Sequence, residues 1–537
     1  MKEILNEYKF QLILVILCFL GLMFFTGHYS NILIDFGREV YYPEQILNGK
    51  ILYKDLFNIY GPLSYQINAV LYKIFGIKLS TLYFAGGISS LLVINGIYLI
   101  ANKFLNRFLS FCLAIFTLTV GVTTSSIFNF HFPYSWGVLY GLIAFIYSLY
   151  FILNFNENKK PLNLYLSSFL AGFCITCKYD FILFAIIILF FIFKNRNLKA
   201  FLCFLTIPIF SFGILFMQGL SISDLLNSFE IVKKMAVSNT LTYFYQNSGI
   251  YFHKKIISTQ LILFIKFIVP FAGIILGSYL FKKNKIISLV VLKFAYVAAA
   301  TLLIHNHKIA FAFMPVLILI SALFSYKKIN TSLLILLCSA LAVSTKTFWL
   351  LLIQSYGTYY IPVIFIAFFA LLFQYLPKNF QRNCGVYVLL ASIIILGKSI
   401  KDYKLVNYKI ETPKGYIYTT KNLATSSTEL INSNLHGKIV IFPEGMTINF
   451  LTNTQSDDFY NSFLPLYAET FGEEKFIEHY KTNMPEYFIF NNLNMKDYYF
   501  EYICKDYGLK FCAFVQENYL LDKVIDNNFR YLIFKRK

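Results

Sequence analysis

The feature that most constrains this chain is a series of apolar runs that follow one another almost without a break through roughly the first 400 residues. A membrane-spanning helix needs about 20 mainly apolar residues, and stretches of this kind recur here. Of the 537 residues, 58% are hydrophobic and only 14% are charged, whereas soluble domains average about 25% charged residues. A water-soluble fold has no interior large enough for so much apolar side chain. The sequence therefore predicts a mainly α-helical, polytopic membrane protein.

We expect about 13 transmembrane helices, each about 20 residues long or somewhat shorter. The two expected spans within 162–194 can also be interpreted as one broken helix. No small-residue cleavage site follows the first run, so it is expected to be retained as a span. The expected spans lie near 11–27, 80–101, 108–122, 133–153, 162–177, 179–194, 199–218, 258–281, 286–304, 309–325, 331–351, 358–376 and 383–400.

Basic residues predict the orientation of these spans. Lys and Arg gather in alternate loops, for example at Lys103 and Arg107, whereas the short loops between them hold only Lys178 and Lys308. By the positive-inside rule the N-terminus is cytoplasmic and the C-terminal segment is extracytoplasmic. The same loops account for the net charge of +20, so a nucleic-acid partner is not expected. We expect a multi-pass protein of a cell membrane, in particular a bacterial inner membrane.

Three segments on the extracytoplasmic side are too long to be simple turns. They are 28–79, 219–257 and the tail 401–537, which follows the transmembrane domain 1–400. The segment 219–257 is long enough to form a lid. In the tail, charged residues return and strand-like runs appear at 438–442, 486–490 and 530–534. We therefore predict a small extracytoplasmic α/β domain. It contains Cys504 and Cys512, for which an exported location permits a disulfide.

The first outer segment, 28–79, carries ionisable residues directly after a span. Asp35 comes first, followed by Arg38 and Glu39. Such groups at the mouth of a helical bundle are costly unless they are solvated or paired, and they often mark function. A local capping pair between Asp35 and Arg38 is the structural alternative. Lys54, Asp55 and Tyr60 follow in the same segment.

The order of these residues resembles the first outer loop of the GT-C superfamily of membrane glycosyltransferases. The resemblance is to the group that includes protein O-mannosyltransferases and lipid A aminoarabinose transferases. It rests on Asp35, Arg38, the Gly-x-x-x-Tyr-x-Asp stretch at 49–55, and the Gly-Pro-Leu-Ser-Tyr stretch at 61–65. It implies a GT-C fold and transfer of a sugar from a polyprenyl-phosphate-linked donor. The acceptor would be a glycolipid, polysaccharide or protein on the outer face, within the membrane lipid environment. It further implies inversion at the anomeric carbon, with Asp35 as the base.

The sequence departs from this family pattern at one position. Many relatives place a lysine just before the proline motif, but this chain has Tyr60 and Gly61 there. Positive charge for a donor phosphate must then come from other residues on the predicted outer face. The candidate substrate- and phosphate-binding residues are Arg38, Glu39, Lys54, Asp55, Tyr60, Lys178, Asp180, His305, His307 and Lys308. A snorkelling Lys178 paired with Asp180 and interfacial packing of the histidines are the structural alternatives.

No cofactor and no metal site are expected. The spacing of His305 and His307 does not place them on one helical face, but a divalent metal on a loop stays open as an alternative. Phosphate-loop, dinucleotide, serine-hydrolase and zinc-protease motifs do not occur. This favours a donor that is already dissolved in the membrane.

Two other function classes remain. One is a flippase or transporter of lipid-linked saccharides, for which polar or broken helices at the membrane midplane are typical. The other is an O-antigen polymerase or ligase, for which arginines in a large later loop are expected; 219–257 contains none. In the tail, the turn Pro443-Glu444-Gly445 is expected to be scaffold, with selection of acceptor or sugar as the alternative.

Overall fold

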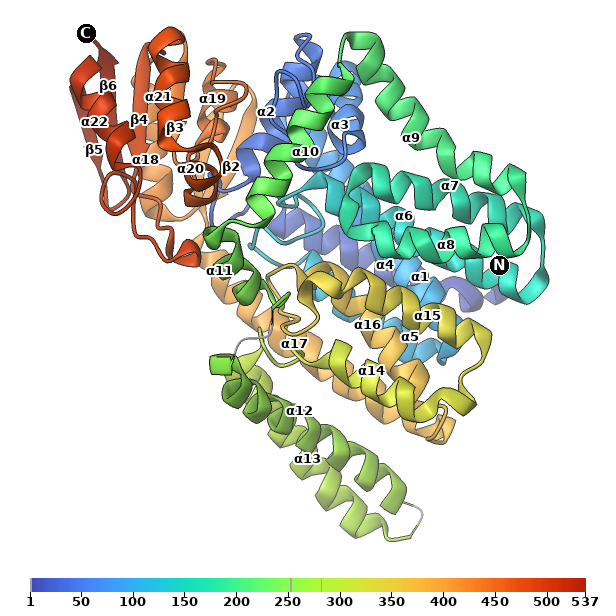
Figure 1. Cartoon of the computed structure of the whole chain (residues 1–537). Coiled ribbons are helices and arrows are strands. Elements are labelled where there is room, and N and C mark those ends of the chain that lie inside the picture. The colour runs from blue at the N-terminus through green and yellow to red at the C-terminus, as the bar shows by residue number, and fades with distance from the viewer. Residues whose placement is uncertain (1, 252–253, 282) are drawn as a thin grey trace.

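The computed structural model describes the chain except residues 1, 252, 253 and 282. A body of long helices carries the C-terminal tail at one end (Figure 1). Helices α12 and α13 form a hairpin that stands apart from the other helices and packs on α17. The helices of the body are α1 (Lys2–Phe25), α4 (Leu79–Phe104), α5 (Arg107–Gly121), α6 (Trp136–Asn158), α7 (Pro161–Cys177), α8 (Ile182–Lys194), α9 (Leu198–Gln218), α12 (Lys254–Leu280), α13 (Lys285–Asn306), α14 (Met314–Ser325), α15 (Thr331–Val343), α16 (Gly357–Leu372) and α17 (Gln381–Leu405).

Every predicted span coincides with one of these helices, and 162–194 forms two helices. Within the described residues, 6 helices are long and apolar enough to cross a membrane by length and composition: α1, α4, α6, α9, α13 and α17. The chain is thus a multi-pass membrane protein, and the number of about 13 spans stays a prediction. The largest difference is at 331–351, where α15 already ends at Val343 and a turn containing Lys346 follows.

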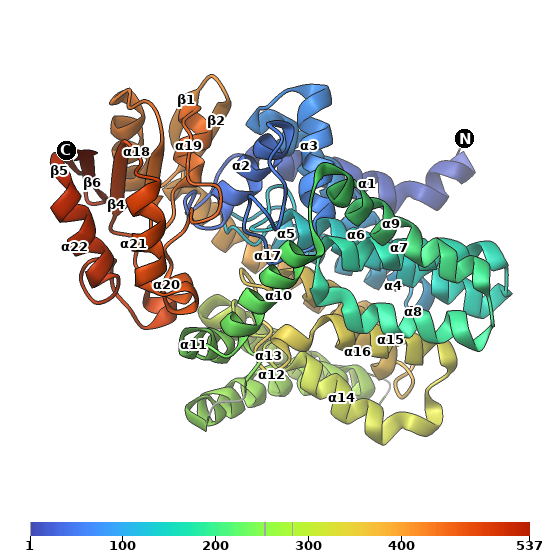
Figure 2. The same ribbon diagram turned by 45° about the horizontal axis from the view of Figure 1, so that its top comes forward.

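The two outer segments of the helical part are themselves helical. Segment 28–79 forms α2 (Phe36–Leu47) and α3 (Leu63–Phe75), and 219–257 forms α10 (Ile222–Ala236) and α11 (Asn239–Ser248) before α12 begins. All four helices lie on the side of the body that faces the tail (Figure 2).

The tail is an α/β unit, as the strand-like runs predict. Its 4-stranded sheet has the order β3-β4-β6-β5, with β3 parallel to β4 and the other pairs antiparallel. A separate hairpin of β1 and β2 precedes it. The disulfide joins Cys504 to Cys512. The elements are β1 (Tyr408–Thr412), β2 (Gly415–Thr419), α18 (Lys421–Asn432), β3 (Ile439–Phe442), α19 (Met446–Thr452), α20 (Pro465–Phe471), α21 (Glu473–Thr482), β4 (Tyr487–Asn491), α22 (Leu509–Asn518), β5 (Tyr519–Asp526) and β6 (Arg530–Arg536).

Helix α2 joins the tail to the helical body. Gly37 lies so close to α19 that a Cβ atom at this position would be 2.6 Å from the backbone nitrogen of Thr447. Hydrogen bonds reinforce the contact: the Ser456 N–H donates to the hydroxyl of Tyr41 (3.0 Å), and Asn461 donates to the hydroxyl of Tyr42 (3.0 Å). The tail is therefore docked on the first outer segment rather than tethered loosely behind α17.

Two ion pairs extend the same interface. Lys50 lies 2.7 Å from Asp458, and Lys414 lies 2.5 Å from Glu44. Glu44 and Lys414 are both largely buried, so this pair is screened less than a surface pair.

We predict that Gly37→Ala weakens this docking, because the added methyl group overlaps the backbone of α19. The expected loss of stability is about 1–3 kcal/mol, typical of overpacking. It is measured by thermal unfolding in detergent, together with the rate of protease cleavage in the tail. Gly397→Ala is the matched control, because nothing lies within 4 Å of a Cβ at that helical position. Equal behaviour of the two variants would contradict the prediction.

Candidate functional site

Asp35 begins the site, at the residue that precedes α2. Its backbone lies in the left-handed region (φ 59°), which Asp and Asn tolerate better than most residues. Arg38 follows three residues later, and its Nη2 donates to Oδ1 of Asp35 at 3.1 Å. The side chains of Asp35 and Arg38 are 27% and 11% exposed, so the pair stands at an accessible edge.

Glu39 anchors the inner side of this pair. Its carboxylate is completely buried and accepts hydrogen bonds from Nε of Arg38 (3.3 Å), the hydroxyl of Tyr65 (3.1 Å) and the N–H of Trp136 (2.9 Å). Burial raises the pKa of Glu39, and these three donors oppose that effect. Because three elements meet at this one carboxylate, Glu39 fixes the direction of the Arg38 side chain.

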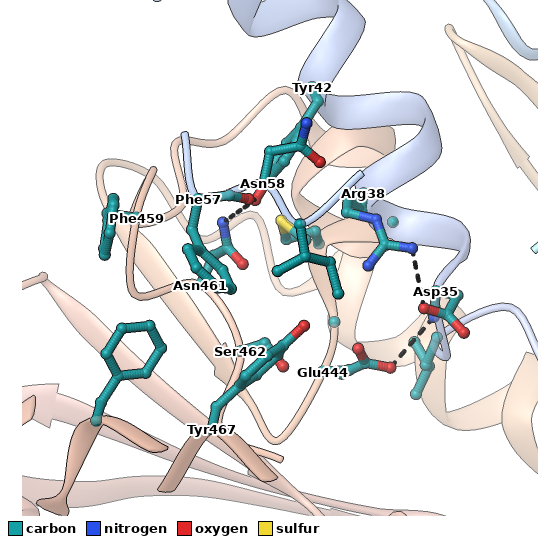
Figure 3. Close-up of a pocket in the computed structure, with 16 residues that line it drawn as sticks. Asp35, Arg38, Tyr42, Phe57, Asn58, Glu444, Phe459, Asn461, Ser462 and Tyr467 are labelled. Atoms are coloured by element: carbon teal, nitrogen blue, oxygen red, sulfur yellow. Dashed lines mark hydrogen bonds and ion pairs between the residues drawn. The ribbon is translucent and has the colours of Figure 1, made fainter. Parts of the chain in front are cut away.

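The tail contributes a second carboxylate beside Asp35. The N–H of Asp35 donates to Oε2 of Glu444 at 3.2 Å, so the two side chains come from opposite ends of the chain (Figure 3). Burial and the nearby charge of Asp35 raise the pKa of Glu444 to about 8, although Arg38 acts in the other direction. Glu444 therefore holds its proton near neutral pH, which relieves the repulsion between the two acids.

Two cationic side chains lie against the ring of Tyr60. The guanidinium carbon of Arg38 is 4.9 Å from the centroid of its ring, and Nζ of Lys178 is 4.4 Å from it. Both distances are in the range of cation–π attraction. Gly61 makes this possible, because a side chain there would overlap the carbonyl of Thr176. Lys178, in the turn after α7, thus stands beside Tyr60, where the sequence lacks the lysine of the family pattern.

Lys178 belongs to a second polar cluster, which also contacts Tyr60. Its Nζ donates to the hydroxyl of Tyr134 (2.6 Å) and lies 3.8 Å from Asp180, which in turn lies 4.0 Å from Lys346. Burial lowers the pKa of Lys178 to about 7; Asp180 opposes this shift and Lys346 adds to it. Two lysines share one carboxylate here, so the cluster has an excess of positive charge that suits an anion.

A hollow of about 550 Å³, counting its part open to solvent, adjoins Asp35 and Arg38. It lies between the first outer segment and the tail (Figure 3). Its walls combine acids, amides and several aromatic rings. The lining residues include Asp35, Arg38, Tyr42, Phe57, Asn58, Glu444, Phe459, Asn461, Ser462, Tyr467 and Phe471.

Five predicted binding residues do not join these clusters. Nζ of Lys54 donates to the carbonyl of Gly219 (3.2 Å), and Asp55 accepts from the N–H of Ile51 (2.9 Å) in a local turn. Both side chains therefore have structural roles at this position.

The histidine turn lies elsewhere too. His305 ends α13 and lines a separate hollow between α12 and α13. His307 Nε2 is buried without a hydrogen-bond partner among the described residues, and the carbonyl of Lys308 accepts from the N–H of Ile353 (3.0 Å). In the described part of the chain, no hydrogen bond or ion pair connects the three with Asp35.

Sequence reasoning missed two charged residues of the site. Lys346 fell inside an expected span, although a lysine flanked by two threonines is an unusual feature for the interior of a membrane helix. Glu444 was noted in a turn that follows a strand, but its distance of more than 400 residues from Asp35 hid their contact. Among the residues described by the structure, no group of three or more His, Cys, Asp or Glu is placed to hold a metal ion.

No protein-family model and no curated protein match this chain. Its structure is similar to that of the archaeal oligosaccharyltransferase AglB from Archaeoglobus fulgidus, in a complex with an inhibitory peptide and a dolichol-phosphate. In that comparison the identity is 13% and the TM-score is 0.48, over 91% of this chain and 70% of the other. It is also similar to ArnT from Cupriavidus metallidurans bound to undecaprenyl phosphate (13% identity, TM-score 0.46, 98% and 97% of the two chains).

We predict that Glu444→Gln changes how stability depends on pH. The folded chain keeps a proton on Glu444 up to about pH 8, whereas the unfolded chain releases it near 4.5. This contribution to stability is fully present below about pH 4.5 and is lost as the pH rises through 8. Thermal unfolding from pH 4.5 to 9 should therefore show a weaker decline for Glu444→Gln than for the wild type.

The matched control is Glu517→Gln, because Glu517 is exposed. Its curve should parallel that of the wild type. If the stability of Glu444→Gln depended on pH in the same way as that of the wild type, this result would contradict the raised pKa of Glu444.

Proposed function

We propose that this chain is an integral-membrane glycosyltransferase that moves a sugar from a polyprenyl-phosphate-linked donor to an acceptor on the extracytoplasmic face. The observation that carries the proposal is the arrangement around Tyr60. Arg38, which is paired with Asp35 at the edge of the hollow, and Lys178, which shares Asp180 with Lys346, both contact the ring of Tyr60. A candidate base and a candidate anion-binding cluster are thus neighbours without being the same group. A transfer reaction of this kind needs both.

In the proposed step, an acceptor hydroxyl attacks the anomeric carbon of the donor sugar. The new bond joins the acceptor oxygen to that carbon as the bond from the carbon to the phosphate oxygen breaks. The proton of the hydroxyl passes to the carboxylate of Asp35, and the electron pair of the broken bond leaves with the polyprenyl phosphate. A single displacement inverts the anomeric centre. A general base in this position typically contributes about 10²–10⁴-fold in rate.

The phosphate needs cationic partners as its charge develops. Lys178 and Lys346 are placed for this role, because they share a single carboxylate, Asp180. A bound phosphate anion would also favour the charged form of Lys178, whose pKa burial has lowered. Arg38 also lies against the Tyr60 ring and contacts Asp35. In this proposal Arg38 links the base, Asp35, to the lysines that bind the donor phosphate.

The proposal includes an orientation in the membrane. The N-terminus is cytoplasmic and the tail is extracytoplasmic, after about 13 spans in the domain 1–400. The clusters of Lys and Arg in alternate loops support this, as does the position of the site at the tail end of the helical body. A reporter fused after residue 410 that was cytoplasmic would contradict the orientation.

The central test of function is sugar transfer by the full chain in proteoliposomes, supplied with radiolabelled polyprenyl-phosphate sugars. We expect Asp35→Asn to lower the transfer rate by about 10²–10⁴-fold. Asn is the appropriate replacement because it also tolerates the left-handed backbone at this position. Asp55→Asn is the matched control, since Asn can still accept the hydrogen bond from Ile51, and it should transfer at close to the wild-type rate.

Equal transfer by the wild type and Asp35→Asn would remove Asp35 as the base. Movement of lipid-linked sugar across the bilayer without any transfer would contradict the proposal and favour a transporter.

The phosphate side makes a separate prediction. Lys346→Met should raise the KM for the donor by about 10- to 100-fold, as expected for loss of one charge-assisted contact. Lys523→Met is the control because it removes the same charge from an exposed ion pair on the tail. Initial rates over a range of donor concentrations give the KM for the donor and the kcat. An unchanged KM in Lys346→Met would exclude Lys346 from donor binding.

A further inference from the structure

We infer that the hollow between the first outer segment and the tail is a subsite for a carbohydrate acceptor, whose sugar ring packs against aromatic side chains while one hydroxyl reaches Asp35. The inference rests on the proposed function and adds the class of acceptor to it. It assigns a role in acceptor selection to the tail, through residues that follow β3 and that form α20.

Aromatic rings make up one wall of the hollow. Phe57 lies at their centre, with ring centroids of Phe459, Tyr467 and Phe471 at 5.5, 5.7 and 5.3 Å. Phe57 is buried, but Phe459 and Phe471 are half-buried and present part of their rings to the hollow. The C–H face of a sugar ring is apolar and packs well on such rings, which also supply large contact area.

Polar groups with free hydrogen-bonding capacity face the same space. Tyr467 is only 9% exposed, yet its hydroxyl makes no hydrogen bond to any described residue. It points toward Arg38 and Glu444 (Figure 3). Because Tyr467 lines the hollow, this hydroxyl is available to a ligand there. Asn461 donates through Nδ2, whereas its Oδ1 accepts no bond from the described part of the chain.

The volume of the hollow, about 550 Å³, includes a part that is open to solvent. In this inference the sugar ring packs against Phe459 and Phe471, and one of its hydroxyls is directed to the part of the hollow that Asp35 and Arg38 line.

A protein acceptor fits the hollow less well. An extended peptide usually adds to an exposed strand edge, where its own N–H and C=O groups find partners. The residues that line this hollow come from helices and loops, since β3 ends at Phe442, before Glu444. The lining also supplies side-chain hydroxyl, amide and carboxyl groups, and these match the many hydroxyls of a sugar.

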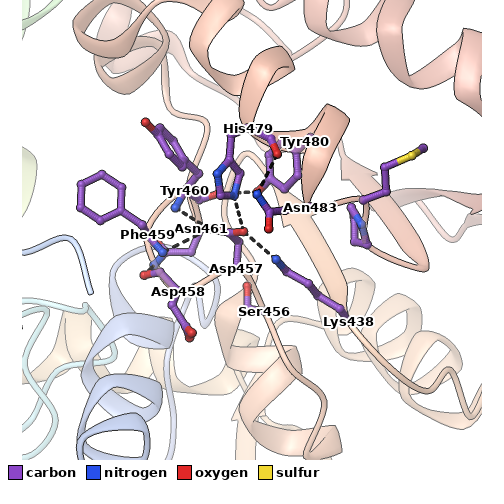
Figure 4. Close-up of polar contacts among 12 residues, drawn as sticks. Lys438, Ser456, Asp457, Asp458, Phe459, Tyr460, Asn461, His479, Tyr480 and Asn483 are labelled. Atoms are coloured by element: carbon purple, nitrogen blue, oxygen red, sulfur yellow. Dashed lines mark hydrogen bonds and ion pairs between the residues drawn. The ribbon is translucent and has the colours of Figure 1, made fainter. Parts of the chain in front are cut away.

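The loop that carries Phe459 and Asn461 is held in place by a buried carboxylate. Oδ2 of Asp457 accepts from Nζ of Lys438 and from Nε2 of His479, both at 2.8 Å (Figure 4). Its Oδ1 accepts from the N–H groups of Phe459 (3.1 Å) and Tyr460 (2.7 Å). Burial alone would raise the pKa of Asp457, but the bonds from His479 and Lys438 outweigh burial and lower the pKa below its ordinary value. A loop fixed in this way loses little entropy when a ligand binds.

Saturation-transfer NMR on the full chain in nanodiscs tests the subsite directly. The probes are the methyl glycosides of glucose, galactose, mannose and arabinose, with a serine-containing hexapeptide for comparison. We expect a saturation-transfer signal on the ring C–H protons of at least one glycoside and no such signal on the peptide. Phe459→Leu and Tyr467→Phe should each reduce this signal by about two- to tenfold. Phe500→Leu is the control, because Phe500 is a half-buried aromatic residue on a different hollow of the tail.

Absence of a signal from every glycoside would overturn the inference. So would a signal that neither variant changes, or a peptide signal that both variants abolish. If Phe459→Leu does not fold, Tyr467→Phe decides, because it removes only one oxygen atom.

The NMR measurement needs neither donor nor turnover. It therefore tests the acceptor subsite independently of the proposed transferase activity. Glycoside binding at this hollow without sugar transfer would contradict the proposed function but support the subsite. Sugar transfer without glycoside binding would support the function but contradict the subsite.

Discussion

The close contact between α2 and α19 is the constraint on which the candidate site depends. Gly37 permits it, because any side chain there would overlap the backbone at Thr447. With the tail seated this close, Glu444 reaches the N–H of Asp35. The opposite side of α2 is fixed by Glu39, which is buried among donors from the helical body. A helix of 12 residues thus contacts both the tail and the helical body at the candidate site.

Two charged groups meet at the ring of Tyr60. In one group Arg38 is paired with carboxylates, and in the other Lys178 and Lys346 share Asp180. Neither group is solvated as it would be in bulk water, so the interactions within each are stronger than on a surface. An anion on the lysine side and a neutral hydroxyl on the carboxylate side are the ligands that these electrostatics favour.

Much of the fold follows from local pattern, whereas the site follows only in part. Apolar runs and strand-like runs are properties of neighbouring residues, so the helices and three of the four strands of the tail sheet were predictable. Asp35 and Arg38 were predictable because they share the first turn of one helix. For the turn that contains Glu444, the sequence indicated selection of acceptor or sugar only as an alternative to a scaffold role, because the contact with Asp35 spans most of the chain. Lys346 was assigned to a span because a hydropathy window averages over a polar turn. His305 lies in the last turn of α13 and lines a different hollow from Asp35, which its position in the sequence did not indicate.

The most direct test of this account is a cryo-electron microscopy structure of the full chain in nanodiscs with undecaprenyl phosphate. The account predicts density for the phosphate within about 4 Å, the range of an ion pair, of the ammonium groups of Lys178 and Lys346, with the carboxylate of Asp35 facing the open hollow. A head group bound elsewhere, for example between α12 and α13 near His305, would contradict it.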